Sequence, residues 1–297
     1  MPRLTAQDFH PEILRLFDRY VHGDLSRRGF LQSATQYAGG TTAGAAAVLA
    51  ALNPNFAQAQ VVKPDDARLA TRTVEFDSPQ GNGKIRGYLA RPAKATGKLP
   101  AVLVVHENRG LSPHIEDITR RLALANFVAC APDALTPLGG YPADEDKARE
   151  LFPKLDQSKT RQDFLVAAQA LKALPESSGH VGAVGFCYGG GIVNWLATQW
   201  PELGAGVPFY GGQPSAAEAA RIKAPLQLHY AGADERLNAG WPAFEVALKA
   251  AGVPHEAFFY AGAQHGFNND TTPRFDAAAA ALAWQRTLAF LDKHLRV

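Results

Sequence analysis

Cys187 stands in the stretch GAVGFCYGGG, at the end of an apolar run and between glycines. Gly185 and Gly189 each lie two residues from the cysteine, which is the spacing of a sharp strand-to-helix turn that presents a nucleophile. Glycine is needed there because the strand and the helix must approach closely. The N–H groups at the start of the following helix would point at the sulfur and favour its thiolate form. The pattern therefore indicates a nucleophilic cysteine.

Two other interpretations of a cysteine in this chain have to be weighed. A free cysteine is commonly an inert buried thiol, and Cys130 fits that description because it lies inside FVACAPD without flanking glycines. A phosphate-binding loop does not fit GFCYGGG, since the Lys-Ser/Thr pair is absent and the glycine spacing is not that of a dinucleotide site. The two cysteines and their spacing indicate neither a disulfide framework nor zinc, so we expect no cofactor and no metal.

A cysteine hydrolase also needs a base and a group that orients the base. His265 follows the apolar segment FFYAGAQ, and Asp234 follows LQLHYAGA. The chain order Cys187, Asp234, His265 is the order of nucleophile, acid and histidine in α/β-hydrolases. His180 stands at the start of a predicted strand, at the opposite end of the sheet, and His229 lies within one, so both are weaker candidates for the base. Turn residues without a catalytic role are the alternative for Asp234 and His265.

These residues must be positioned by a sheet, and the rest of the chain predicts one. An antiparallel hairpin is expected over 71–79 and 83–92, where apolar and polar residues alternate. Uninterrupted apolar runs follow, which are typical of strands covered on both faces. Segments with apolar residues at helical spacing separate these runs. This order predicts an α/β fold with a mostly parallel sheet and helices on both faces. The expected strands are 101–107, 127–133, 180–186, 205–211, 224–232 and 256–262, and the expected helices are 115–126, 160–174, 188–200, 240–252 and 277–295.

Composition limits the class of protein. The 297 residues include 46% hydrophobic and 20% charged residues, which is enough to bury a full core. The formal net charge is only +2, so no broad basic surface is available to neutralise a phosphate backbone. We therefore expect no nucleic-acid partner and a small molecule as the ligand.

Residues 1–59 are predicted to be separate from a single domain over 60–297. SRRGFLQ resembles the twin-arginine export signal, with Arg27 and Arg28 as the pair, and Ala57-Gln58-Ala59 suits a signal peptidase. Export would place the protein in the periplasm. A membrane-spanning helix is not expected, because glycines interrupt the apolar tract.

A retained helical arm is the alternative for this segment. PEILRLFDRYV places Ile13, Leu14, Phe17 and Val21 at roughly helical spacing. The segment also carries more acidic residues than is usual for a signal. An arm of this kind would pack on the body or on a second subunit of a homo-oligomer, and the protein would stay in the cytoplasm.

The segments HENRGL, GFCYGG, AGADERLN and HGF resemble those of the dienelactone hydrolase family (carboxymethylenebutenolidases), over about residues 70–295. The resemblance implies the α/β-hydrolase fold and hydrolysis of an ester or lactone through a thioester on Cys187. It implies that His265 shuttles the proton and that Asp234 orients the histidine.

The resemblance also implies roles for the segment after the third strand. The residue matching Glu107 contacts the resting thiol in that family and takes part in converting it to thiolate. The oxyanion would lie between the backbone N–H groups of Tyr188 and Asn108. From the residues alone, Glu107 could equally satisfy loop N–H groups.

Substrate recognition departs from the family pattern. Family members acting on dienelactone hold its carboxylate with two arginines, but the corresponding stretches PDALTPLGG and HGFNNDTTP contain none. Arg109 is a candidate substitute, with a solvated loop arginine as the alternative. Tyr141, Trp241 and Phe267 are candidates to line the pocket.

Three other activities remain open at this point. The same fold could serve an acyltransferase or thioesterase. A non-catalytic small-molecule binding protein could retain the pocket and the thiol, and a low-pKa cysteine could act as a redox sensor.

Overall fold

The computed structural model describes residues 3–56 and 60–296, and the triplet 57–59 of the predicted peptidase site lies outside them. The described strands form one eight-stranded sheet in the order β1-β2-β4-β3-β5-β6-β7-β8. β1 pairs antiparallel with β2, and β2 pairs antiparallel with β4, whereas the strands from β4 to β8 are parallel. The strands are β1 (Leu69–Ser78), β2 (Gly83–Pro92), β3 (Leu99–Val105), β4 (Val128–Pro132), β5 (Ser177–Phe186), β6 (Ala205–Phe209), β7 (Leu226–Ala231) and β8 (His255–Tyr260).

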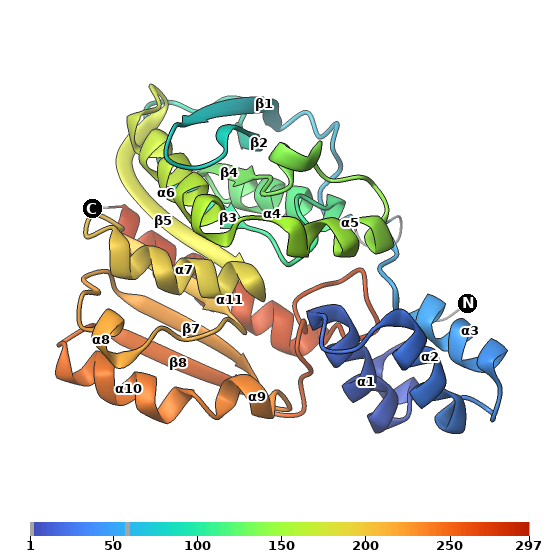
Figure 1. The fold of residues 1–297 in the computed structure, drawn as a ribbon. Helices are drawn as coiled ribbons and strands as arrows, with labels where there is room; N and C mark the ends of the chain where they lie inside the picture. Colours follow the sequence, from blue (N-terminus) through green and yellow to red (C-terminus); the bar gives the residue numbers. More distant parts are fainter. Residues whose placement is uncertain (1–2, 57–59, 297) are drawn as a thin grey trace.

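Helices cover both faces of the sheet (Figure 1). On one face, α4 (Pro113–Leu124) packs against β2, β3 and β4, and α11 (Ala277–Leu295) packs against β5, β6 and β7. On the other face, α6 (Gln157–Ala173) packs against β3 and β5, and α7 (Tyr188–Gln199) packs against β5 and β6, while α10 (Trp241–Ala250) belongs to the same buried apolar cluster. The central strands are apolar on both sides because both sides are covered. The predicted α/β-hydrolase fold, with its opening hairpin, is confirmed.

Three short helices were not expected from the sequence. They are α5 (Glu145–Leu151), α8 (Ala216–Ala219) and α9 (Glu235–Asn238). Each begins at a side chain that caps its first N–H groups: Asp144 for α5, Ser215 for α8 and Asp234 for α9. A second difference concerns β5, which begins three residues earlier than predicted. His180 therefore lies inside that strand, near its start, and is exposed.

The N-terminal segment forms a helical unit, defined here as α1 (Pro11–His22), α2 (Arg27–Ala34) and α3 (Thr42–Leu52). The three helices surround a small core of their own that includes Ile13, Phe17, Phe30 and Leu49. Figure 1 shows the unit, in blue, beside the end of the sheet where the strand arrows point. Both arginines of the predicted export signal lie in α2, and Arg27 forms an ion pair with Asp146 of α5.

In the part of the chain that the structure describes, no helix is both long enough and apolar enough to cross a membrane.

Candidate active site

Cys187 occupies the single-residue turn between β5 and α7. Its backbone has φ 56° and ψ −113°, a conformation that costs energy for a residue with a side chain. A Cβ on Gly185 would lie 2.1 Å from the carbonyl oxygen of Gly189, and a Cβ on Gly189 would lie 2.2 Å from that of Val105. The two glycines thus allow the close packing that holds the cysteine in its strained position, as the sequence predicts.

Gly189→Ala is expected to lower the free energy of unfolding by about 3 kcal/mol or more, because the new methyl group would overlap the backbone of β3. Urea denaturation would measure the change. Gly191→Ala in the same helix is the control, since its methyl group would meet neighbours no closer than 3.6 Å. Alanine also favours helix, so this control should be neutral or stabilising. Equal effects of the two substitutions would contradict the prediction.

His265 and Asp234 come together beside this turn. Nδ1 of His265 donates a hydrogen bond to Oδ2 of Asp234 at 2.6 Å, and both side chains are almost fully buried. With Nδ1 hydrogen-bonded to the carboxylate, the other ring nitrogen, Nε2, is available to interact with the sulfur of Cys187. Among the described residues this buried Nε2 has no hydrogen-bond partner. The structure therefore brings together the three residues that the sequence predicts.

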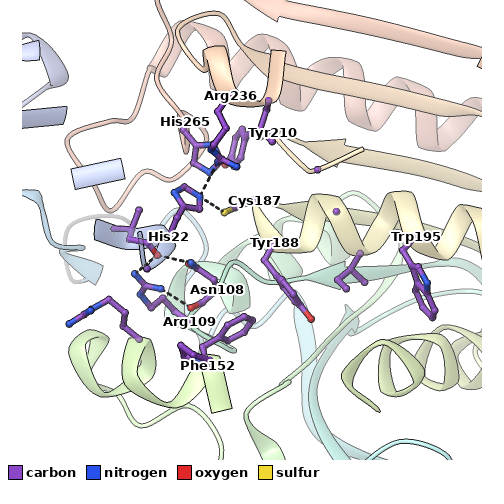
Figure 2. A pocket seen from close by; sticks show the side chains of 18 of the residues that line it. His22, Asn108, Arg109, Phe152, Cys187, Tyr188, Trp195, Tyr210, Arg236 and His265 are labelled. Carbon is purple, nitrogen blue, oxygen red and sulfur yellow. Dashed lines mark hydrogen bonds between the residues drawn. The ribbon is translucent and has the colours of Figure 1, made fainter. Parts of the chain in front are cut away.

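A second histidine contacts the nucleophile. Nε2 of His22, the last residue of α1, lies 3.5 Å from Sγ of Cys187 (Figure 2). Its ring packs edge-on against that of His265, with centroids 4.7 Å apart. Nδ1 of His22 donates to the backbone carbonyl of Asp18 at 2.7 Å, and a carboxylate oxygen of Asp18 lies 3.4 Å away. Sequence reasoning missed His22, because it precedes Cys187 by 165 residues and belongs to no catalytic motif.

The electrostatics of the cluster favour a charged sulfur. Burial alone would raise the pKa of Cys187, but His265 and His22 lower it to about 6. Burial opposes the charged form of His265, yet the Cys187 thiolate and Asp234 raise its pKa to about 9. Burial likewise opposes the charged form of His22, while hydrogen bonds to Asp18 and Cys187 raise its pKa to about 10. The contacts within the cluster therefore favour the thiolate of Cys187 and the charged forms of both histidines.

Cys130 provides the contrast. It is fully buried in the sheet, and burial raises the pKa of its thiol well above the ordinary value. His229 is also a core residue, because burial lowers its pKa to about 3 and Tyr260 and Gln227 satisfy its ring nitrogens. The structure places both residues in the core, as the sequence predicts.

The segment after β3 forms another side of the site. Oε2 of Glu107 accepts a hydrogen bond from Nδ2 of Asn269 at 2.8 Å. The side chain hydrogen-bonded to Sγ of Cys187 is that of His22, in the place where the family resemblance leads us to expect Glu107. Asn108 and Tyr188 both line the cavity at Cys187. Tyr188 is the first residue of α7, so no carbonyl in its own helix can accept from its N–H. That N–H group remains available for an oxyanion.

A cavity of about 850 Å³ opens above the sulfur. The aromatic residues that line it are not those predicted from the sequence, and they are Phe152, Tyr188, Trp195 and Tyr210.

The aromatic residues predicted to line the cavity are absent from its described lining and serve in packing instead, namely Tyr141, Trp241 and Phe267. The Tyr141 hydroxyl donates to Glu145, Trp241 packs against Tyr230, and Phe267 is buried against Tyr210.

Arginines reach the cavity from elements that the family pattern does not use. Arg109, the candidate substitute for the family's arginines, lines it, and its guanidinium donates to the carbonyls of Asn108 and Val21 and lies 3.7 Å from Glu145. Part of its hydrogen-bonding capacity is therefore used within the protein. Arg149, Arg161 and Arg236 also line the cavity.

The sulfur and the two histidines form a donor set that the sequence spacing does not indicate. One ligand atom from each of His22, Cys187 and His265 lies within 4.8 Å of the others. Thiolate and imidazole are ligands that suit Zn²⁺. A bound ion would occupy the sulfur and so compete with its attack on a carbonyl carbon.

Comparison with known proteins adds independent information. The profile described as "Dienelactone hydrolase family" matches residues 85–295, and a profile described as "YqhI-like" matches residues 1–39. An Escherichia coli K12 protein named "Putative hydrolase fragment YghX" is 51% identical over 105 residues, which are 35% of this chain and 90% of that protein. A Synechocystis protein named "Putative carboxymethylenebutenolidase" is 31% identical over 243 residues, which are 76% of this chain and 98% of the relative.

A solved structure is similar as well. The crystal structure titled "Putative Dienelactone Hydrolase" from Klebsiella pneumoniae superposes with a TM-score of 0.65 and 28% identity, covering 75% of this chain and 99% of the other. The profile match extends from β2 to α11 and includes Cys187, Asp234 and His265. The chain belongs to the dienelactone hydrolase family.

Proposed function

We propose that the protein hydrolyses a small ester or lactone through a Cys187-His265-Asp234 triad and a thioester intermediate. The observation that carries the proposal is the strained Cys187 turn, with its sulfur beside an imidazole that Asp234 holds by Nδ1. The names of the family and of its relatives support the ester or lactone class.

The steps follow from the positions of these groups. The Cys187 thiolate attacks the acyl carbon, and the N–H groups of Tyr188 and Asn108 stabilise the oxyanion. The C–O bond then breaks, and the leaving alkoxide takes the proton from Nε2 of His265. Neutral His265 next removes a proton from water, whose oxygen attacks the thioester. The C–S bond breaks, releasing the carboxylic acid and restoring the thiolate and the imidazolium.

Intact-protein mass spectrometry with a panel of aryl esters and lactones tests this mechanism. A slowly deacylated ester should add one acyl group to the wild-type chain, and peptide mapping should place it on Cys187. Adding a competing alcohol or thiol separates hydrolysis from acyl transfer, because a transferase would form the new ester or thioester in preference to the acid. Ligand binding without an adduct or turnover would instead identify a binding protein and overturn the proposal.

The activity should depend on pH as a bell-shaped curve. Attack requires the thiolate, which is lost as the pH falls through about 6. Leaving-group protonation requires the imidazolium of His265, which is lost as the pH rises through about 9. A profile of kcat/KM from about pH 4 to about pH 11 should show both limbs. An acid limb near the unperturbed thiol value of 9.0 would contradict the assignment.

Export by the twin-arginine route stays a prediction, with cytoplasmic retention of the whole chain as its alternative. Cell fractionation followed by N-terminal sequencing decides between them. A periplasmic protein that begins after residue 59 would confirm export, and a cytoplasmic protein with an intact start would exclude it.

A further inference from the structure

The helical unit is attached to the body at the edge of the active site. The carbonyl of Val21 accepts hydrogen bonds from Nδ2 of Asn108 at 2.7 Å and from Nη2 of Arg109 at 3.2 Å. The Tyr20 hydroxyl donates to Asp146 at 3.0 Å. The end of α1 thereby holds the loop whose Asn108 N–H is expected to bind the oxyanion.

The end of α1 also directs His22 towards the sulfur. Gly23 closes the helix with φ 90°, a left-handed conformation that suits glycine. His22 lines the cavity together with Cys187, and its side chain is 17% exposed. The cavity remains open beside it, so His22 forms a wall of the site and does not fill it.

The hydrogen bonds of His22 define what it can do. A backbone carbonyl can only accept, so the bond to the Asp18 carbonyl places a proton on Nδ1. Nε2 then faces Sγ of Cys187 at 3.5 Å. The carboxylate of Asp18 and the thiolate favour a positive charge on His22, whereas the guanidinium of Arg236, 3.4 Å from Nε2, opposes it. Asp18 is itself held by Arg274 at 3.5 Å.

This arrangement parallels that of the predicted base. His265 uses Nδ1 for Asp234 and leaves Nε2 for the sulfur, and His22 uses Nδ1 for Asp18 and presents Nε2 to the same sulfur. Glu107, the residue expected next to the resting thiol, is bonded to Asn269 instead.

We propose that His22 is a catalytic residue supplied by the helical unit, and that its contact with Sγ keeps Cys187 in the thiolate form before substrate binds. Asp18 is its positioning residue. This inference rests on the proposed function only in that Cys187 is the nucleophile.

Alkylation of the full-length protein by iodoacetamide tests the proposal, because only the thiolate reacts. The alkylation rate of Cys187 is measured as a function of pH for the wild type and for His22→Gln. The substitution should raise the pH at which the alkylation rate is half-maximal by about one unit or more. At pH values below this midpoint, the alkylation rate should therefore be about tenfold lower than in the wild type. Asp18→Asn should move the midpoint in the same direction by a smaller amount. An unchanged midpoint in folded His22→Gln would overturn the proposal.

The control is Arg15→Ala on the same helix, since the Arg15 side chain is 71% exposed. It should alkylate as the wild type does. Circular dichroism and thermal unfolding establish that each variant is folded, and Asp18→Asn provides the test if His22→Gln is not. Alkylation needs no ester substrate, so the two proposals can fail separately. A shifted midpoint without any ester hydrolysis would sink the proposed function alone, and hydrolysis with an unshifted midpoint would sink the role of His22 alone.

Discussion

Cys187→Ala is expected to lower kcat/KM for the best ester or lactone by about 10⁴-fold or more, because no other group at the turn can form the acyl intermediate. The cavity and the remaining hydrogen bonds should persist, so substrate binding should change little. Steady-state kinetics and calorimetric binding measure the two effects separately.

Cys130→Ala is the matched control for that substitution. Cys130 is buried in β4 on the side of the sheet covered by α6 and α7, so its loss should reduce stability modestly and leave kcat/KM near the wild-type value. Full activity of the Cys187→Ala protein would remove the basis of the proposed function.

Asp234→Asn is expected to lower kcat by about 10⁴-fold, since an amide no longer holds His265 in the tautomer that leaves Nε2 for the sulfur. Asp234 also caps α9 by accepting from the N–H of Leu237. Asparagine caps helices as well as aspartate does, so the fold should survive the substitution.

Asp144→Asn makes the same change at the cap of α5 and serves as the control. Kinetics and thermal unfolding of both variants separate the two roles of the carboxylate. A small loss of kcat in Asp234→Asn, comparable to that of the control, would show that Asp234 does not orient the base.

The features that were predictable from the sequence are those set by local pattern. Apolar runs covered on both faces mark the central strands, and Gly185 and Gly189 mark the turn at Cys187. Because parallel strands end at one edge of the sheet, the positions of Asp234 and His265 after their strands were enough to predict that they meet the cysteine.

The features that were not predictable depend on packing between distant segments. His22 reaches Cys187 only because the helical unit is attached through Val21 and Asp146, and neither contact leaves a periodic signal in the sequence. The prediction of the residues that line the cavity was wrong for the same reason. Trp241 begins α10 and its indole packs on Tyr230, whereas Trp195 of α7 lines the cavity.

The attachment of α1 has a consequence for maturation. If the export prediction is correct, a peptidase cut after residue 59 removes Val21, His22 and Leu25 from the cavity wall and frees Asn108 and Arg109 from their contact with Val21. The precursor would then have a narrower cavity with two imidazoles beside the sulfur, and the processed form would have a wider cavity with one. The two forms would therefore differ in substrate selectivity.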